Sequence, residues 1–210
     1  MHLSLTEADE IRAERITLFW DYRLAAKIPG CLPGDWGSIP HSLVTYFSDC
    51  KMTKATLLKT VPAPVRSMIR RNARPSKAVL KSAGYSINTN GVYKWVAIHD
   101  THVLKFSRTP RMNCVVEREV AMYNTLTREQ KRLAVPMFLV GPSMSIAPRV
   151  LAHDPRKHET TMMNSIALGL RQVWETMGVE WTDDHYDNVG FMLGRDYPIV
   201  IDLDFLVSTR

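Results

Sequence analysis

The sequence of 210 residues contains only three cysteines, and their spacing excludes several classes of protein. Cys31, Cys50 and Cys114 are odd in number and form no Cys-x-x-Cys pair. This usage argues against a disulfide framework and a zinc site, and it is typical of a reducing cytoplasm. The sequence also lacks any apolar run of about 18 residues, the length that a membrane-spanning helix needs. We therefore expect a cytoplasmic protein with no membrane partner.

Acidic residues are missing from a long central segment. Residues 51–99 hold ten lysines and arginines and no aspartate or glutamate, whereas residues 151–210 hold five basic and ten acidic residues. Such asymmetry indicates either an anionic partner or two regions that face each other in the fold. Residues 51–81 show no zinc finger, RRM signature or interleaved aromatic residues. A nucleic-acid site at residues 51–81 nevertheless stays open as one alternative. The other is a basic helix that is solvated or packed within the protein.

Residues 1–80 are predicted to form an N-terminal helical extension that is basic in its second half. Residues 6–26 begin with a capping threonine and have acidic residues in their first turn. Shorter helices are expected at residues 41–49, 53–60 and 63–72. The last of these has one apolar and one basic face.

Residues 81–152 predict five antiparallel strands and one helix. Apolar and β-branched residues cluster in five runs, with Asn90-Gly91 and a His-Asp pair as turn signals. The runs are residues 85–87, 92–98, 101–106, 136–141 and 144–151. A helix with apolar residues three and four positions apart lies between the third and fourth runs. The fold class is therefore expected to be α+β.

Residues 153–210 are predicted to form a helix and then a hairpin with an acidic end. Two short strands flank a turn at residues 194–196. Asp183 and Asn188 stand just before the first strand, and Asp202 directly follows the second. A hairpin would bring both groups to the same end. Carboxylate and amide oxygens gathered there would suit Mg²⁺, which takes its other ligands from substrate phosphates.

Two segments of this region resemble known enzymes. Asp183-Asp-His185-Tyr-Asp-Asn188 resembles the catalytic loop of protein-kinase-like phosphotransferases, including the Asp-x-His-x-x-Asn form of aminoglycoside and choline kinases. Ile201-Asp202-Leu203-Asp204-Phe205 resembles the metal-binding segment that follows that loop. The resemblance covers about residues 84–205 and is greatest to the compact serine/threonine kinases of lytic bacteriophages. It implies a small antiparallel β lobe followed by a truncated helical lobe that contains the catalytic-loop hairpin.

The resemblance implies a nucleotide site in the β lobe. Lys105, in a strand, would hold the phosphates of ATP, and Glu119 in the following helix would pair with this lysine. Asn90 and Gly91 would lie in the turn that stands where kinases keep a glycine-rich phosphate loop. That motif itself is absent, because Gly84 and Gly91 are the only glycines nearby.

The resemblance also assigns roles in the hairpin region. Asp183 would accept the proton of the acceptor hydroxyl or orient it, and Asn188 and Asp202 would hold Mg²⁺. His185 and Asp204 are secondary candidates. The substrates implied are host proteins, in the host cytoplasm if a phage encodes the chain.

Several departures from the kinase pattern leave two alternatives open. Asp204 replaces a usual glycine, and only eight residues follow Asp202, too few for the helices that hold peptide substrates. We expect residues 6–72 to pack against this short lobe and supply its missing core. One alternative is a kinase-like fold that binds and inhibits a host protein without transferring phosphate. The other is the nucleic-acid-binding protein that uses residues 51–81.

Overall fold

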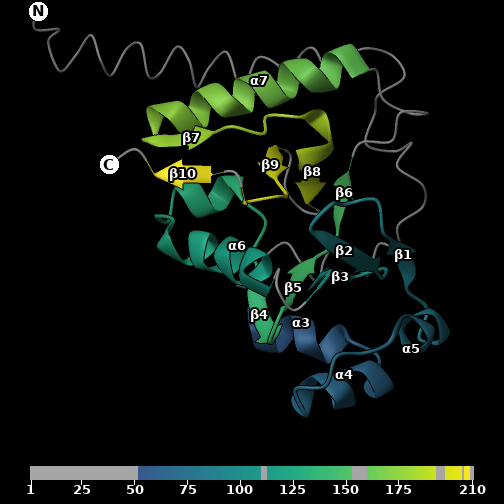
Figure 1. The fold of residues 1–210 in the computed structure, drawn as a ribbon. Helices are drawn as coiled ribbons and strands as arrows, with labels where there is room; N and C mark the ends of the chain where they lie inside the picture. Colours follow the sequence, from purple (N-terminus) through teal and green to yellow (C-terminus); the bar gives the residue numbers. More distant parts are fainter. Residues whose placement is uncertain (1–51, 110–112, 153–159, 193–196, 205, 209–210) are drawn as a thin grey trace, which may run out of the picture. The chain divides into compact units, whose positions relative to one another are not determined.

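The computed structural model describes residues 52–109, 113–152, 160–192, 197–204 and 206–208. They belong to one compact unit, Val44–Arg210. The helices predicted at residues 6–26 and 41–49 lie outside the described residues. Figure 1 shows the helices and strands of the described part.

Three short helices open the described chain: α3 (Lys54–Thr60), α4 (Ala63–Arg70) and α5 (Lys77–Ser82). Thr53 caps α3 by accepting a hydrogen bond from the backbone N–H of Thr56, and Ser76 caps α5 in the same way through Val79. Such caps satisfy backbone donors that a helix start leaves without an internal partner. The helices predicted at residues 53–60 and 63–72 are confirmed.

A five-stranded antiparallel sheet follows, in the order β1-β2-β3-β5-β4. Its strands are β1 (Ser86–Asn88), β2 (Lys94–Ile98), β3 (His102–Ser107), β4 (Phe138–Gly141) and β5 (Met144–Pro148). Helix α6 (Asn113–Thr125) lies between β3 and β4 in the chain and contacts β3, β4 and β5. The predicted α+β class with five antiparallel strands is confirmed.

One face of this sheet packs against helices α3 to α5. Apolar residues from the helices and from alternate strand positions form one buried cluster between them. Its members are Leu57, Val61, Val65, Ile69, Leu80, Tyr85, Trp95, Ala97, Leu104, Phe106, Val140, Met144 and Ile146. The expectation that residues 6–72 cover the C-terminal part is therefore wrong for their described portion. The sheet presents its own apolar face, and the apolar stripes of α3 and α4 bury it.

The opposite face of β2 and β3 carries polar side chains. Val96 pairs with Lys105, and Lys94 pairs with Ser107. Side chains alternate between the two faces of a strand, so Lys94, Val96 and Lys105 point away from the apolar cluster that contains Trp95 and Phe106. This geometry places two lysines beside each other on the same face of the sheet.

The C-terminal part combines one long helix with short strands. Its elements are β6 (Val150–Ala152), α7 (Thr160–Thr176), β7 (Val179–Trp181), η4 (Tyr186–Asn188), β8 (Val189–Met192), β9 (Pro198–Val200) and β10 (Leu206–Ser208). Strands β6, β8 and β9 form one sheet, and β10 pairs with β7 beside α7 (Figure 1). The predicted hairpin is confirmed as β8 and β9, which pair antiparallel. No helix within the described residues is long and apolar enough to cross a membrane.

Candidate functional site

The β8–β9 hairpin brings the two halves of the predicted acidic site together. Val189 pairs with Val200, so the residues just outside the pair, Asn188 and Ile201, are also neighbours. The backbone N–H of Ile201 donates a 2.9 Å hydrogen bond to the carbonyl oxygen of Asn188. Asp202, the residue after Ile201, therefore lies beside the loop that holds Asn188, as the sequence predicted.

Asp183 and Asn188 are fixed relative to each other. The Nδ2 atom of Asn188 donates hydrogen bonds of 2.7 Å to Oδ2 of Asp183 and 3.1 Å to its carbonyl oxygen. Both side chains are half-buried. Because the amide nitrogen of Asn188 is used in this way, its amide oxygen is the atom suited to a hard cation.

Lys105 and Glu119 form the ion pair expected from the sequence. The Nζ atom of Lys105 donates to Oε1 of Glu119, and it also donates a 2.8 Å bond to the carbonyl oxygen of Ile201. Glu119 is completely buried, and its neighbours on α6, Val116 and Val120, are buried as well. Ile201 therefore links the two halves of the site, with its carbonyl on Lys105 and its N–H on Asn188.

Lys94 is a member of the site that sequence reasoning missed. Its Nζ atom lies 2.6 Å from Oδ1 of Asp202, 2.6 Å from Oδ2 of Asp204 and 3.3 Å from Oε2 of Glu119. A signal for it existed in the sequence. Lys94 and Lys105 lie on the same face of adjacent strands once the β2–β3 pairing is assumed.

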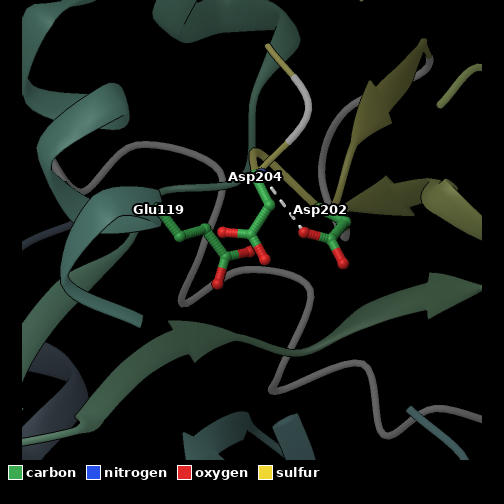
Figure 2. Close-up of side chains that lie close together, drawn as sticks. All are labelled: Glu119, Asp202 and Asp204. Carbon is green, nitrogen blue, oxygen red and sulfur yellow. Dashed lines mark hydrogen bonds between the residues drawn. The ribbon is translucent and has the colours of Figure 1, made fainter. Parts of the chain in front are cut away.

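Three carboxylates, from Glu119, Asp202 and Asp204, converge in this centre (Figure 2). One oxygen from each lies within 4.8 Å of the others. The backbone N–H of Asp204 donates a 3.3 Å hydrogen bond to Oδ1 of Asp202, and that of Leu203 donates one of 3.4 Å to Oε1 of Glu119. We call Glu119, Asp202, Asp204 and the two lysines, Lys94 and Lys105, the charged cluster.

Burial and opposite charges shift the ionisation of the charged cluster in different directions. Burial alone would raise the pKa of Asp202, but attraction to Lys105 and Lys94 holds that pKa well below its usual range. Burial alone would lower the pKa of Lys94, but attraction to Glu119 and then to the two aspartates raises it. The complete burial of Glu119 raises its pKa against the pull of both lysines.

Two carboxylate oxygens of the charged cluster are incompletely satisfied. Within the described residues, Oδ1 of Asp204 and Oε2 of Glu119 are buried and make no hydrogen bond, although the latter faces Lys94 at 3.3 Å. Buried polar atoms ordinarily have a hydrogen-bonding partner. Carboxylate oxygens of this kind are potential ligands of a divalent cation.

The turn expected to face the nucleotide is held by contacts of its own. The backbone N–H of Asn90 donates a 2.9 Å hydrogen bond to Oδ1 of Asn88. Arg108 donates from Nε to the carbonyl oxygen of Gly91 at 2.6 Å, and from its guanidinium to that of Thr89. A Cβ atom at position 91 would lie 2.6 Å from the carbonyl oxygen of Lys94, so this close approach requires glycine. The role of Asn90 and Gly91 toward phosphates stays a prediction.

His185 lies apart from the charged cluster at the start of η4. Its Nδ1 atom accepts a 3.3 Å hydrogen bond from the backbone N–H of Asp187, and its side chain is 52% exposed. Its side chain therefore caps the start of η4.

Comparison with known proteins identifies no family. No family model matches the chain, and no curated protein matches it.

Proposed function

We propose that the protein is a Mg²⁺- and ATP-dependent phosphotransferase with a protein-kinase-like fold, similar to the compact serine/threonine kinases of lytic bacteriophages, and that it acts on host proteins. One observation carries the proposal. The Lys105–Glu119 ion pair is joined through the backbone of Ile201 to Asp202 on one side and to Asn188 on the other. A strand lysine, a helix glutamate and a loop aspartate thereby meet beside the loop that carries Asp183.

Each group has a defined task in this proposal. Lys105, oriented by Glu119, neutralises the phosphates of ATP, and Asp202 and the amide oxygen of Asn188 hold Mg²⁺. When bound, Mg²⁺ supplies positive charge to the phosphate oxygens. The acceptor hydroxyl oxygen forms a bond to the γ-phosphorus, whose bond to the bridging oxygen of ADP breaks. The hydroxyl proton passes to the carboxylate of Asp183, which Asn188 holds in place.

A second candidate is a kinase-like protein that binds and inhibits a host protein without transferring phosphate. It is favoured by the position of Lys94, whose ammonium lies 2.6 Å from Oδ1 of Asp202, the carboxylate that would hold the metal. The contacts of Arg108 with the turn at residues 89–91 also favour it, because a side chain of the protein itself holds that turn in place.

Thermal denaturation with and without nucleotide separates the two candidates. A ligand at about 100 times its dissociation constant stabilises a protein by roughly 2.7 kcal/mol. The phosphotransferase should therefore melt at a higher temperature in Mg²⁺ plus ATP than in Mg²⁺ alone. No shift at millimolar ATP would favour the inhibitor.

A further inference from the structure

Lys94 supplies a cation at the centre of the three carboxylates. Its ammonium contacts one oxygen of each, at 2.6 Å for Asp202 and Asp204 and at 3.3 Å for Glu119. The carboxylates of the two aspartates lie on alternate residues of one short segment, next to the fully buried Glu119. Without a cation, three such carboxylates would repel one another. The arrangement therefore needs a positive charge at this position.

Lys105 does not fill this role. Its ammonium donates to Glu119 and to the carbonyl oxygen of Ile201, which fixes it on the other side of the glutamate. Lys94 is instead the cation in direct contact with both aspartates. The two lysines therefore have separate positions within the charged cluster, although they lie side by side on the sheet.

The ammonium of Lys94 leaves the carboxylates incompletely satisfied. An ammonium has three N–H donors, and those of Lys94 face three different carboxylates. Oδ1 of Asp204 is left buried without a hydrogen bond among the described residues, on a side chain that is only 6% exposed. A divalent cation takes six or more oxygen ligands and would use such an atom. The three carboxylates thus offer more oxygen ligands than the ammonium of one lysine uses.

Resting on the proposed function, we propose that Lys94 is a built-in competitor of the divalent cation: its ammonium occupies the cation position among Glu119, Asp202 and Asp204, and metal enters only when Lys94 withdraws. Its flexible four-carbon stem allows the ammonium to move without a change in the backbone of β2. Metal binding and the position of Lys94 are then linked, because both cations require the same oxygens. The intact chain accordingly binds divalent metal weakly until this lysine is displaced.

Titration of the full chain with Mn²⁺, in the absence of nucleotide, tests this competition. Free Mn²⁺ is measured by electron paramagnetic resonance for the wild type and for Lys94→Met. We expect Lys94→Met to bind one Mn²⁺ at least tenfold more tightly than the wild type. The control is Lys81→Met, which removes an exposed ammonium outside the charged cluster, and it should show no such gain. Adding Asp204→Asn to Lys94→Met should abolish the gain.

Equal Mn²⁺ affinity of the wild type and a folded Lys94→Met protein would overturn the inference, as would a gain that persists with Asp204→Asn. If Lys94→Met does not fold, Lys94→Gln, which keeps an N–H donor and removes the charge, undergoes the same comparison. Failure of the proposed function looks different. In that case Lys94→Met gains Mn²⁺ affinity while neither protein transfers phosphate from ATP.

Discussion

Lys94 and Asp202 are joined by a 2.6 Å contact between Nζ and Oδ1, although 108 residues separate them in the chain. The lysine begins strand β2, and the aspartate follows strand β9. This contact and that of Lys105 with Ile201 tie the five-stranded sheet to the β8–β9 hairpin. The charged cluster is therefore part of the structural link between the two sheets as well as the candidate site.

Replacement of Lys105 by methionine should destabilise the fold. Breaking one side of a buried ion pair costs about 3–5 kcal/mol, because it leaves an uncompensated buried charge. We expect a loss of about 3 kcal/mol in the free energy of unfolding, at the low end, since Lys94 still lies 3.3 Å from Glu119. Urea denaturation measures it, with exposed Lys81→Met as the control. A loss no larger than that of the control would show that the pair is not a stabilising element.

Much of the five-stranded sheet and of the charged cluster was predictable, because their signals are local. Apolar residues mark the strands, and the segments around Lys105, Glu119 and Asp202 resemble those of protein-kinase-like phosphotransferases. Lys94 was missed because its carboxylate partners lie far along the chain and no motif names it. Strands β7 and β10 were missed because these short strands pair with each other across the β8–β9 hairpin, so no turn between them marks the pair in the sequence. The packing of α3 and α4 was predicted wrongly because an apolar stripe shows that a helix is covered, but not by which surface.

Stability should fall below neutral pH because of His102. This histidine is fully buried, with Nε2 at 2.6 Å from the hydroxyl of Tyr85 and Nδ1 at 2.9 Å from Oγ1 of Thr101. Burial and then the neighbouring His99 lower the pKa of His102 from 6.5 to about 3. The unfolded chain therefore binds a proton below about pH 6.5 that the folded protein excludes. The stabilising contribution is complete above that pH and is lost progressively down to about pH 3.

The loss of unfolding free energy expected from His102 determines the pH values at which stability is compared. Each pH unit below 6.5 costs about 1.4 kcal/mol, so a loss of roughly 2 kcal/mol is expected between pH 7 and pH 5. Urea denaturation at both pH values measures the difference, and His102→Gln should reduce the slope over this range. An identical slope for the two proteins would contradict the assignment.

Replacement of Leu57 by alanine should show how far the stability of the sheet depends on its packing against α3. Leu57 is fully buried in the cluster between the helices and the sheet. Leu57→Ala should cost about 2–5 kcal/mol of unfolding free energy, because it removes buried methyl groups and leaves a cavity. Lys59→Ala, at an exposed position on the same helix, is the control for lost side-chain packing. A fragment of residues 76–210 that is soluble and melts cooperatively would show instead that the sheet needs no such cover.

Asp202→Asn should weaken the binding of Mg²⁺ with ATP. The substitution keeps the shape of the side chain and removes the charge that holds the metal, so affinity should fall at least tenfold. Calorimetric titration with ATP at fixed Mg²⁺ measures the change. Asp184→Asn, which removes a carboxylate paired with Arg171 outside the charged cluster, should bind like the wild type. Equal affinities for the Asp202→Asn and wild-type proteins would remove Asp202 from the metal site.

Transfer of the γ-phosphate of ATP to host proteins by Asp183→Asn tests the central claim most directly. Asn188 donates to the carboxylate of Asp183 in the wild type, and the substitution keeps the shape of the side chain while removing its ability to take a proton. Asp187→Asn, on the same loop with a side chain that is 66% exposed, is the matched control. A phosphotransferase should lose two or more orders of magnitude in transfer rate with Asp183→Asn and little with Asp187→Asn, while ATP binding barely changes. Undiminished phosphate transfer by the Asp183→Asn protein would contradict the account.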